Sequence, residues 1–139
     1  MEFKKFGSKY VVRLDKGDEI LNSITEFCKQ TKVSLGNITG IGACDKAVLG
    51  VFDCKTQTHI EKEFSGHYEI SSLLGNITNL NGEPFVHAHI CLSGSDYSTI
   101  GGHLHSAVIN IIGEIIIDTI DGEVGREFNS SVGAEALKF

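Results

Sequence analysis

Clusters of positive charge are scarce in this sequence. Lysine and arginine together number 12, against 18 aspartates and glutamates, so the net charge is −6 near neutral pH. The densest basic patch, formed by Lys4, Lys5 and Lys9, is typical of a solvated segment near the N-terminus. Proteins bind nucleic acids mainly by placing cations against phosphates. The composition therefore argues against nucleic acid as a partner. An acidic chain can still carry a local basic face.

The sequence also lacks closely paired cysteines, a secretory leader and an apolar run long enough to cross a membrane. Its four cysteines, Cys28, Cys44, Cys54 and Cys91, show no C-x-x-C spacing. The most apolar run, AVINIIGEIII, is too short for a bilayer and is interrupted by an asparagine and a glutamate. These features predict a cytoplasmic protein without a membrane partner, in which the cysteines are reduced thiols buried as small apolar side chains.

Proline is almost absent, with one residue, whereas glycine occurs 16 times. This combination favours many tight turns between strands over disorder. The 139 residues are 41% hydrophobic and contain no evident linker or repeat, so residues 1–139 are predicted to form a single domain with one core. No nucleophile elbow, phosphate-binding loop or complete dinucleotide fingerprint occurs, so the corresponding classes of enzyme are not predicted.

One segment has helical periodicity, and most of the others have the composition of strands. In residues 16–32, apolar side chains recur at intervals of three and four residues, which predicts an amphipathic helix. Segments rich in β-branched residues or in alternating polarity predict strands, namely residues 9–14, 35–44, 46–53, 58–64, 67–80, 85–93 and 107–120. One main helix with a strongly curved, mostly antiparallel sheet is an α+β fold.

Three consecutive isoleucines at residues 115–117 stand in the last of these predicted strands. A strand directs successive side chains to opposite faces, so both faces of this strand are predicted to be covered. Burial at an interface between subunits is one way to cover the outer face.

Four of the six histidines lie within residues 84–108, in two pairs with the same spacing. His87 and His89 lie two residues apart in a predicted strand, so their side chains point to one face and Ala88 points to the other. His103 follows a loop that ends in two glycines, which allow a close return of the backbone beside the first pair. Three imidazoles with an open coordination position are typical of catalytic zinc sites, although nickel, copper and iron accept the same ligands.

The other histidines are open to several interpretations. His105 is a candidate for a fourth ligand, for a hydrogen-bond partner or proton relay behind the ligands, or for an exposed side chain. The two pairs are also compatible with hydrogen-bonded or exposed histidines that bind no metal. His59 lies in a strand rich in charge and is predicted to be solvated.

A metal-bound imidazole is usually oriented by a carboxylate or a carbonyl group. Glu69, Asp96 and Glu114 are the candidate carboxylates. Glu69 lies on a strand predicted to be half-buried, so it is a candidate catalytic acid or base, with an exposed strand residue as the alternative. Asp96 is more typical of a turn.

Three motifs, GHYEISSLLGNI, HAHICLS and GGHL, occur in this order at suitable intervals and resemble the PPC domain found in plants and prokaryotes. The resemblance covers nearly the whole chain. It implies a strongly curved sheet like that of acetolactate decarboxylase, assembled as a homotrimer. It also implies that His87, His89 and His103 hold zinc or another divalent transition metal, whereas His105 lies outside the motif.

Plant proteins with this domain carry AT-hooks, which are short basic elements that enter the minor groove, and they have an arginine where this chain has His67. No AT-hook occurs here. Two functions stay open: a trimeric metal-binding protein with a small-molecule ligand at the metal, and a DNA-associated regulatory or protein-interaction module without catalysis. The sequence does not decide whether the protein is an enzyme.

Overall fold

The computed structural model describes residues 1–139, which form a single sheet and one helix. The elements in chain order are β1 (Glu2–Phe6), β2 (Lys9–Asp15), α1 (Ile20–Thr31), β3 (Gly36–Asp53), β4 (Thr58–Leu80), β5 (Glu83–Ser93), β6 (Thr99–Thr119), β7 (Gly125–Asn129) and β8 (Ala134–Lys138). Every strand pairing is antiparallel except the contact of β4 with β7. The predicted α+β fold with a mostly antiparallel sheet is confirmed.

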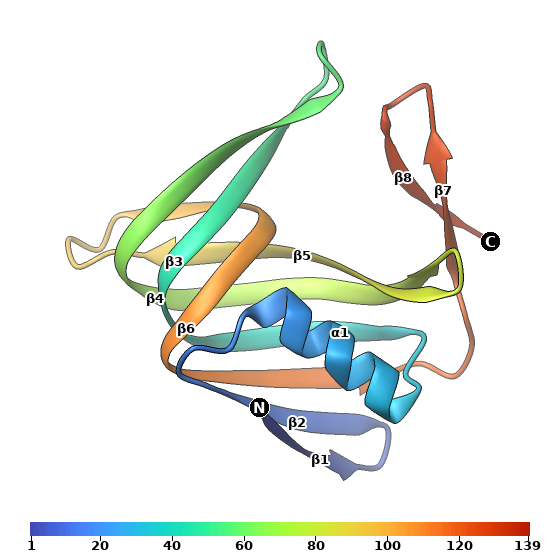
Figure 1. Ribbon diagram of the computed structural model, residues 1–139, viewed down its shortest axis with the longest axis horizontal. Helices are drawn as coiled ribbons and strands as arrows, with labels where there is room; N and C mark the ends of the chain where they lie inside the picture. The colour runs from blue at the N-terminus through green and yellow to red at the C-terminus, as the bar shows by residue number, and fades with distance from the viewer.

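The sheet curves until four of its strands form a ring. β3 pairs with β4 and β6, and β5 pairs with the same two strands. The strands are long enough to bend, with 18 residues in β3, 23 in β4 and 21 in β6. Register shifts between Gly42 and Lys46 mark β-bulges, which increase the local bend. Figure 1 shows the β3–β4 hairpin extending beyond this ring, opposite the β7–β8 hairpin.

Helix α1 lies against the sheet and covers the core (Figure 1). Its buried residues, Ile20, Ile24, Phe27 and Cys28, form the predicted apolar stripe. They pack in one hydrophobic cluster with inward-facing side chains from β2 to β6. Burial of this stripe, more than helix propensity, stabilises a helix of only 12 residues.

Glu19 joins the start of the helix to the sheet. Its carboxylate accepts hydrogen bonds from the backbone N–H groups of Leu21 and Asn22, at 3.2 and 2.7 Å, and of Ala107 on β6, at 3.1 Å. Two N–H groups that the helix leaves without partners are thereby satisfied. The helix therefore begins at Ile20, whereas the periodicity predicted a start at residue 16.

Several segments differ from the sequence-based expectation. The two strands predicted on either side of residue 45 are one strand, β3, and the two predicted on either side of residues 65–66 are one strand, β4. Bulges, in place of turns, accommodate the glycine-rich parts. The N-terminal basic segment forms β1, all of whose residues are exposed. The C-terminal tail forms the β7–β8 hairpin.

Within one chain, only the inner face of the isoleucine-rich strand is covered. Ile115 and Ile117 are buried, whereas Ile116 is 38% exposed. The outer side of the sheet has an apolar surface around a hollow of about 640 Å³. We call this surface the apolar face, and its exposed members are Val11, Ile41, Leu74, Ile112 and Ile116.

All four cysteines are free thiols. Cys28 and Cys44 are buried as predicted. Cys54 and Cys91 are exposed, which corrects the prediction for these two, because Cys54 lies in the β3–β4 turn and Cys91 alternates with buried neighbours on β5. The only helix, α1, is neither long enough nor apolar enough to span a membrane.

Candidate metal centre

The structure brings the three predicted metal ligands together. The ring centroids of His87 and His89 are 5.3 Å apart. The ring centroid of His103 lies 5.0 Å from that of His87 and 5.4 Å from that of His89. One ring nitrogen from each residue lies within 4.8 Å of the other two. His87 and His103 are half-buried, and His89 is exposed. An ion at their centre would have imidazole on one side and an open side toward solvent.

Strand pairing explains why these side chains meet. On β5, Ala88 is buried in the core, so His87 and His89 project from the opposite side of the strand. His89 is the direct cross-strand partner of His103 on β6. The return of the chain requires a glycine, because a Cβ atom at Gly101 would lie 2.8 Å from the carbonyl oxygen of Ile90.

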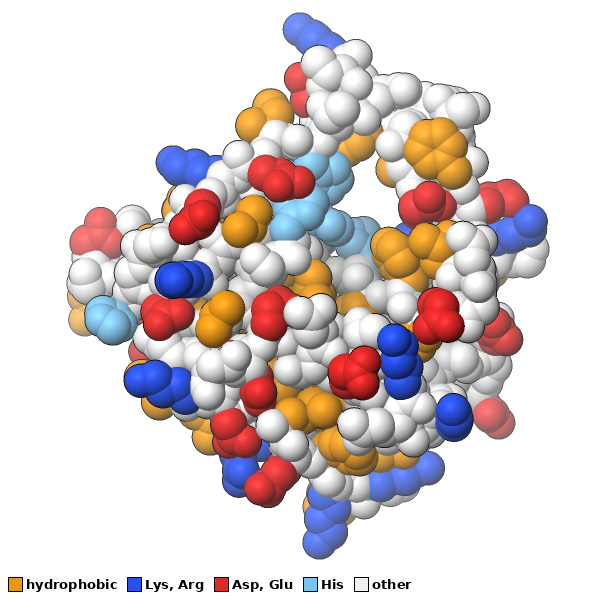
Figure 2. Space-filling view, in the orientation of Figure 1, with side chains coloured by type: hydrophobic (Ala, Val, Ile, Leu, Met, Phe, Trp, Pro, Cys, Tyr) orange, Lys and Arg blue, Asp and Glu red, His pale blue; other side chains and the backbone are white.

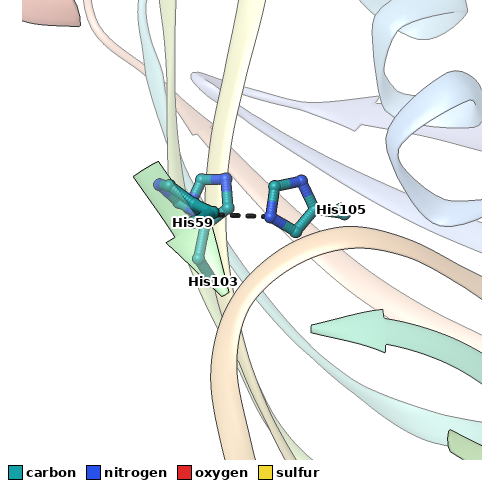
Figure 3. Close-up of side chains that lie close together, drawn as sticks. All are labelled: His59, His103 and His105. Carbon is teal, nitrogen blue, oxygen red and sulfur yellow. Dashed lines mark hydrogen bonds between the residues drawn. The ribbon is translucent and has the colours of Figure 1, made fainter. Parts of the chain in front are cut away.

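Two more histidines reach the same place, His59 from β4 and His105 from β6. The ring of His103 lies 4.6 Å from that of His59 and 4.8 Å from that of His105, centroid to centroid. Nδ1 of His59 and Nε2 of His105 share a hydrogen bond of 3.1 Å, as Figure 3 shows. His59, which the sequence predicts to be solvated, is only partly exposed and belongs to a second triad with His103 and His105.

The sequence contained a weak signal for the second triad. His59 and Glu61 have the same i, i+2 spacing as His103 and His105, so each pair projects from one face of its strand. The spacing does not show whether the face that carries His59 and Glu61 meets the face that carries His103 and His105. The pairing of β3 with both β4 and β6 decides it, because His59 and Glu61 then lie on one side of β3 and His103 on the other.

Four of these histidines stand at the wall of a cavity of about 870 Å³, namely His59, His87, His89 and His103. Figure 2 shows their pale-blue atoms in a hollow between the β3–β4 hairpin and the β7–β8 hairpin. The C-terminal β7–β8 hairpin contributes Arg126 and Glu135 to the lining. Phe52 and Phe85 give the cavity an aromatic part. The cavity thus combines candidate metal ligands with a cation, a carboxylate and apolar surface.

Arg126 is held in a fixed position at the edge of this cavity. Its Nε donates to the hydroxyl of Thr78 at 2.8 Å, its Nη1 to the carbonyl oxygen of Glu135 at 2.9 Å, and its Nη2 to Oδ1 of Asn76 at 2.9 Å. The guanidinium also lies over the ring of Phe85, at 4.8 Å from its centroid. All three acceptors are neutral, so no carboxylate offsets the positive charge through these bonds.

The electrostatics of the site keep its inner imidazoles neutral. Burial, followed by the neighbouring histidines, lowers the pKa of His103 from 6.5 to about 4. Burial and then the charge of Arg126 lower the pKa of His87. A transition metal binds the neutral imidazole, so both residues are in the ligand form near pH 7.

The candidate carboxylates chosen from the sequence lie elsewhere. Glu69 is exposed on β4, where it pairs with Ser93, and it lines other hollows than the histidine cavity. Glu114 is exposed beside the apolar face. Asp96 forms the expected turn, in which its carboxylate accepts hydrogen bonds from the N–H and hydroxyl groups of Ser98. The carboxylates that do line the cavity are Glu61 and Glu135.

Acidification is expected to destabilise the metal-free protein. Because the pKa of His103 is lowered from 6.5 to about 4 on folding, the unfolded chain binds more protons between these values. Its contribution to the free energy of unfolding is complete above pH 6.5 and is lost as the pH falls toward 4. With allowance for solvent screening, the loss is about 2 kcal/mol. Urea unfolding of the metal-free protein at several pH values measures it, and an equally steep pH dependence in His103→Asn would contradict this assignment.

The chain is similar to known proteins over most of its length. The model of the Plants and Prokaryotes Conserved (PCC) domain matches residues 1–121. A Bacteroides thetaiotaomicron protein described as a candidate DNA-binding protein is 36% identical, with a TM-score of 0.96 over 99% of this chain and 96% of that chain. A protein from Archaeoglobus fulgidus described as metal-containing is 31% identical, with a TM-score of 0.90 over 100% of this chain and 99% of that chain.

The chain is also similar to solved structures of lower sequence identity. A Pyrococcus horikoshii plant- and prokaryote-conserved protein is 29% identical, with a TM-score of 0.88 over 99% of this chain and 95% of that chain. Acetolactate decarboxylase from Bacillus subtilis is 15% identical, with a TM-score of 0.60 over 84% of this chain and 54% of that chain, which confirms the predicted likeness of fold. No curated protein matched. The extent of the family match shows that the chain belongs to the Plants and Prokaryotes Conserved (PCC) domain family.

Proposed function

We propose that this chain is a cytoplasmic, homotrimeric metal-binding protein in which His87, His89 and His103 hold one divalent transition metal, with zinc as the first candidate. The convergence of three ring nitrogens within 4.8 Å at the wall of a cavity carries the proposal. Three nitrogen donors suit zinc, copper, nickel and iron. The metal-containing A. fulgidus relative, at 31% identity, supports a metal in this chain.

The ligand of the metal is proposed to be a small anionic molecule. Three protein ligands leave a coordination position open to the cavity, and such an ion polarises a bound oxygen. The guanidinium of Arg126 faces the same cavity, and its direct hydrogen bonds go to neutral acceptors. A carboxylate or similar group is the natural partner of this cation. Glu69 has no part in the proposal, because it does not line the cavity.

The homotrimer is supported by the apolar face. Five large aliphatic side chains, each at least 37% exposed, stand together there on the outer side of the sheet. An apolar surface of this kind is unusual on a monomer and is normally covered by a partner. Light scattering is expected to give three times the chain mass, and Ile116→Asp is expected to give one chain mass. A monomeric unmutated protein would overturn this part of the proposal.

Metal analysis tests the central claim. After incubation with zinc and removal of free metal, the unmutated protein is expected to hold at least one zinc per chain. His87→Ala is expected to lose one equivalent, because two imidazoles hold zinc much more weakly than three. His67→Ala is the matched control, since His67 is exposed and lies outside both triads. Absence of zinc from the unmutated protein would end the proposal.

A second candidate function is association with DNA without catalysis. The description of the B. thetaiotaomicron relative, at 36% identity, favours it. Contacts with phosphates release counterions, so real binding weakens steeply as salt rises. Titration of duplex DNA at increasing salt tests it, and absence of binding at low salt would remove this candidate.

A further inference from the structure

The second group of histidines is not needed for the proposed metal centre. His59 and His105 are both half-buried, and their facing ring nitrogens, Nδ1 and Nε2, are 3.1 Å apart. The Glu61 carboxylate lies near them, with Oε1 at 3.6 Å from Nε2 of His105. Two imidazoles and a carboxylate are a common ligand set for zinc. This group stands beside the first triad, and His103 is in contact with both.

The spacing of these atoms matches that of metal ligands. Two nitrogen atoms bound to a tetrahedral zinc at 2.0–2.1 Å lie about 3.3 Å from each other. The separations of 3.1 Å and 3.6 Å lie on either side of this value. Nε2 of His105 therefore lies at ligand-like distances from Nδ1 of His59 and from Oε1 of Glu61, and a rotation of the exposed Glu61 side chain would complete the set around one ion.

Gly50 provides the space in which these side chains meet. It lies on β3, between Glu61 on β4 and His103 on β6. A Cβ atom on Gly50 would lie 2.5 Å from Nε2 of His105 and 2.7 Å from Nδ1 of His59. Any other residue at this position would push both ring nitrogens apart.

We propose that His59, His105 and Glu61 form a second metal site beside the first, so that the cavity holds two divalent ions per chain. His103 belongs to both histidine triads, and it stays with the first ion when both sites are filled. Glu61 then takes its place as the third ligand of the second ion. This inference rests on the proposed function only for the location of the first ion.

The charges of the cavity suit two cations. Glu61 and Glu135 both line it, and the chain as a whole has a net charge of −6. The three side-chain hydrogen bonds of Arg126 go to Thr78, Glu135 and Asn76, none of which belongs to the second group. Carboxylates near the second ion lower the cost of placing two dications close together.

A cobalt titration distinguishes one site from two. Co²⁺ in a tetrahedral nitrogen and oxygen site absorbs visible light, so the end point of the titration counts the ions, and elemental analysis provides an independent count. The unmutated protein is expected to bind two equivalents. His105→Asn and Gly50→Ala are each expected to bind one, and Glu61→Gln is expected to weaken the second equivalent at least tenfold. His67→Asn serves as the control and is expected to bind two.

The outcomes separate this inference from the proposed function. A single equivalent that is lost in His87→Ala and kept in His105→Asn would overturn the second site and leave the first in place. Two equivalents of which His87→Ala removes neither would overturn the ligands proposed for the first site. Circular dichroism of each variant verifies that the fold is intact, and a second equivalent that persists in both His105→Asn and Glu61→Gln would also overturn the inference.

Discussion

Replacing Gly75 by alanine is expected to lower the free energy of unfolding by about 3 kcal/mol and to abolish metal binding at the first triad. Gly75 on β4 is the cross-strand partner of Ala88 on β5, between His87 and His89. A Cβ atom at Gly75 would lie 2.5 Å from the carbonyl oxygen of His87 and 2.9 Å from Cβ of Ala88. Neither atom can move away unless the backbone of β5 moves. The same displacement therefore strains the sheet and shifts both histidines.

Urea unfolding and zinc analysis measure the two effects of this substitution. Gly125→Ala is the matched control, because a Cβ atom there would meet nothing closer than 4.0 Å. We expect this control to change the free energy of unfolding by less than about 0.5 kcal/mol and to bind zinc normally. A Gly75→Ala protein with unchanged stability and unchanged zinc content would contradict the packing argument.

Zinc is expected to raise the melting temperature of the metal-free protein by about 15 °C. An ion that binds only the folded state at a thousandfold excess over its dissociation constant adds about 4 kcal/mol to the free energy of unfolding. For a chain of this size, each kcal/mol corresponds to about 4 °C. The physical cause is that the three imidazoles come from two strands, β5 and β6, which the ion joins together.

The melting experiment requires zinc and chelator as its two arms. His103→Ala is expected to lose more than half of the shift, since His103 is the only ligand of the first triad that β6 supplies. His67→Ala is expected to keep all of it. A shift of the same size in His103→Ala would show that zinc acts at another place on the protein.

Local patterns predicted much of this molecule. The three- and four-residue spacing of Ile20, Ile24, Phe27 and Cys28 predicted the buried stripe of the helix. The H-x-H spacing predicted that His87 and His89 share one face of a strand, with Ala88 on the other. Such predictions succeed because the backbone geometry of a helix or strand determines which side chains share a face.

The second histidine group shows where local patterns end. His59 lies 44 residues before His103 in the chain (103 minus 59), and its own strand is rich in charge. Nothing near it in the sequence indicates that β3 pairs with both β4 and β6, or that Gly50 leaves room for its ring. Glu69 illustrates the opposite error, since its half-apolar surroundings suggested burial, but it is exposed.

By itself, the sequence determined the class of the fold, the helix, the strand that carries His87 and His89, and the loop that returns His103 beside them. Only the tertiary structure decided that His59 and Glu61 line the same cavity, with His105 in contact with both. It also decided that Arg126 from the C-terminal hairpin lines this cavity and that Ile116 is exposed on an apolar face. The physical reason is the distance along the chain over which each feature is determined. Side-chain direction repeats every two or 3.6 residues, whereas the neighbours of a strand depend on how a curved sheet closes over the whole chain.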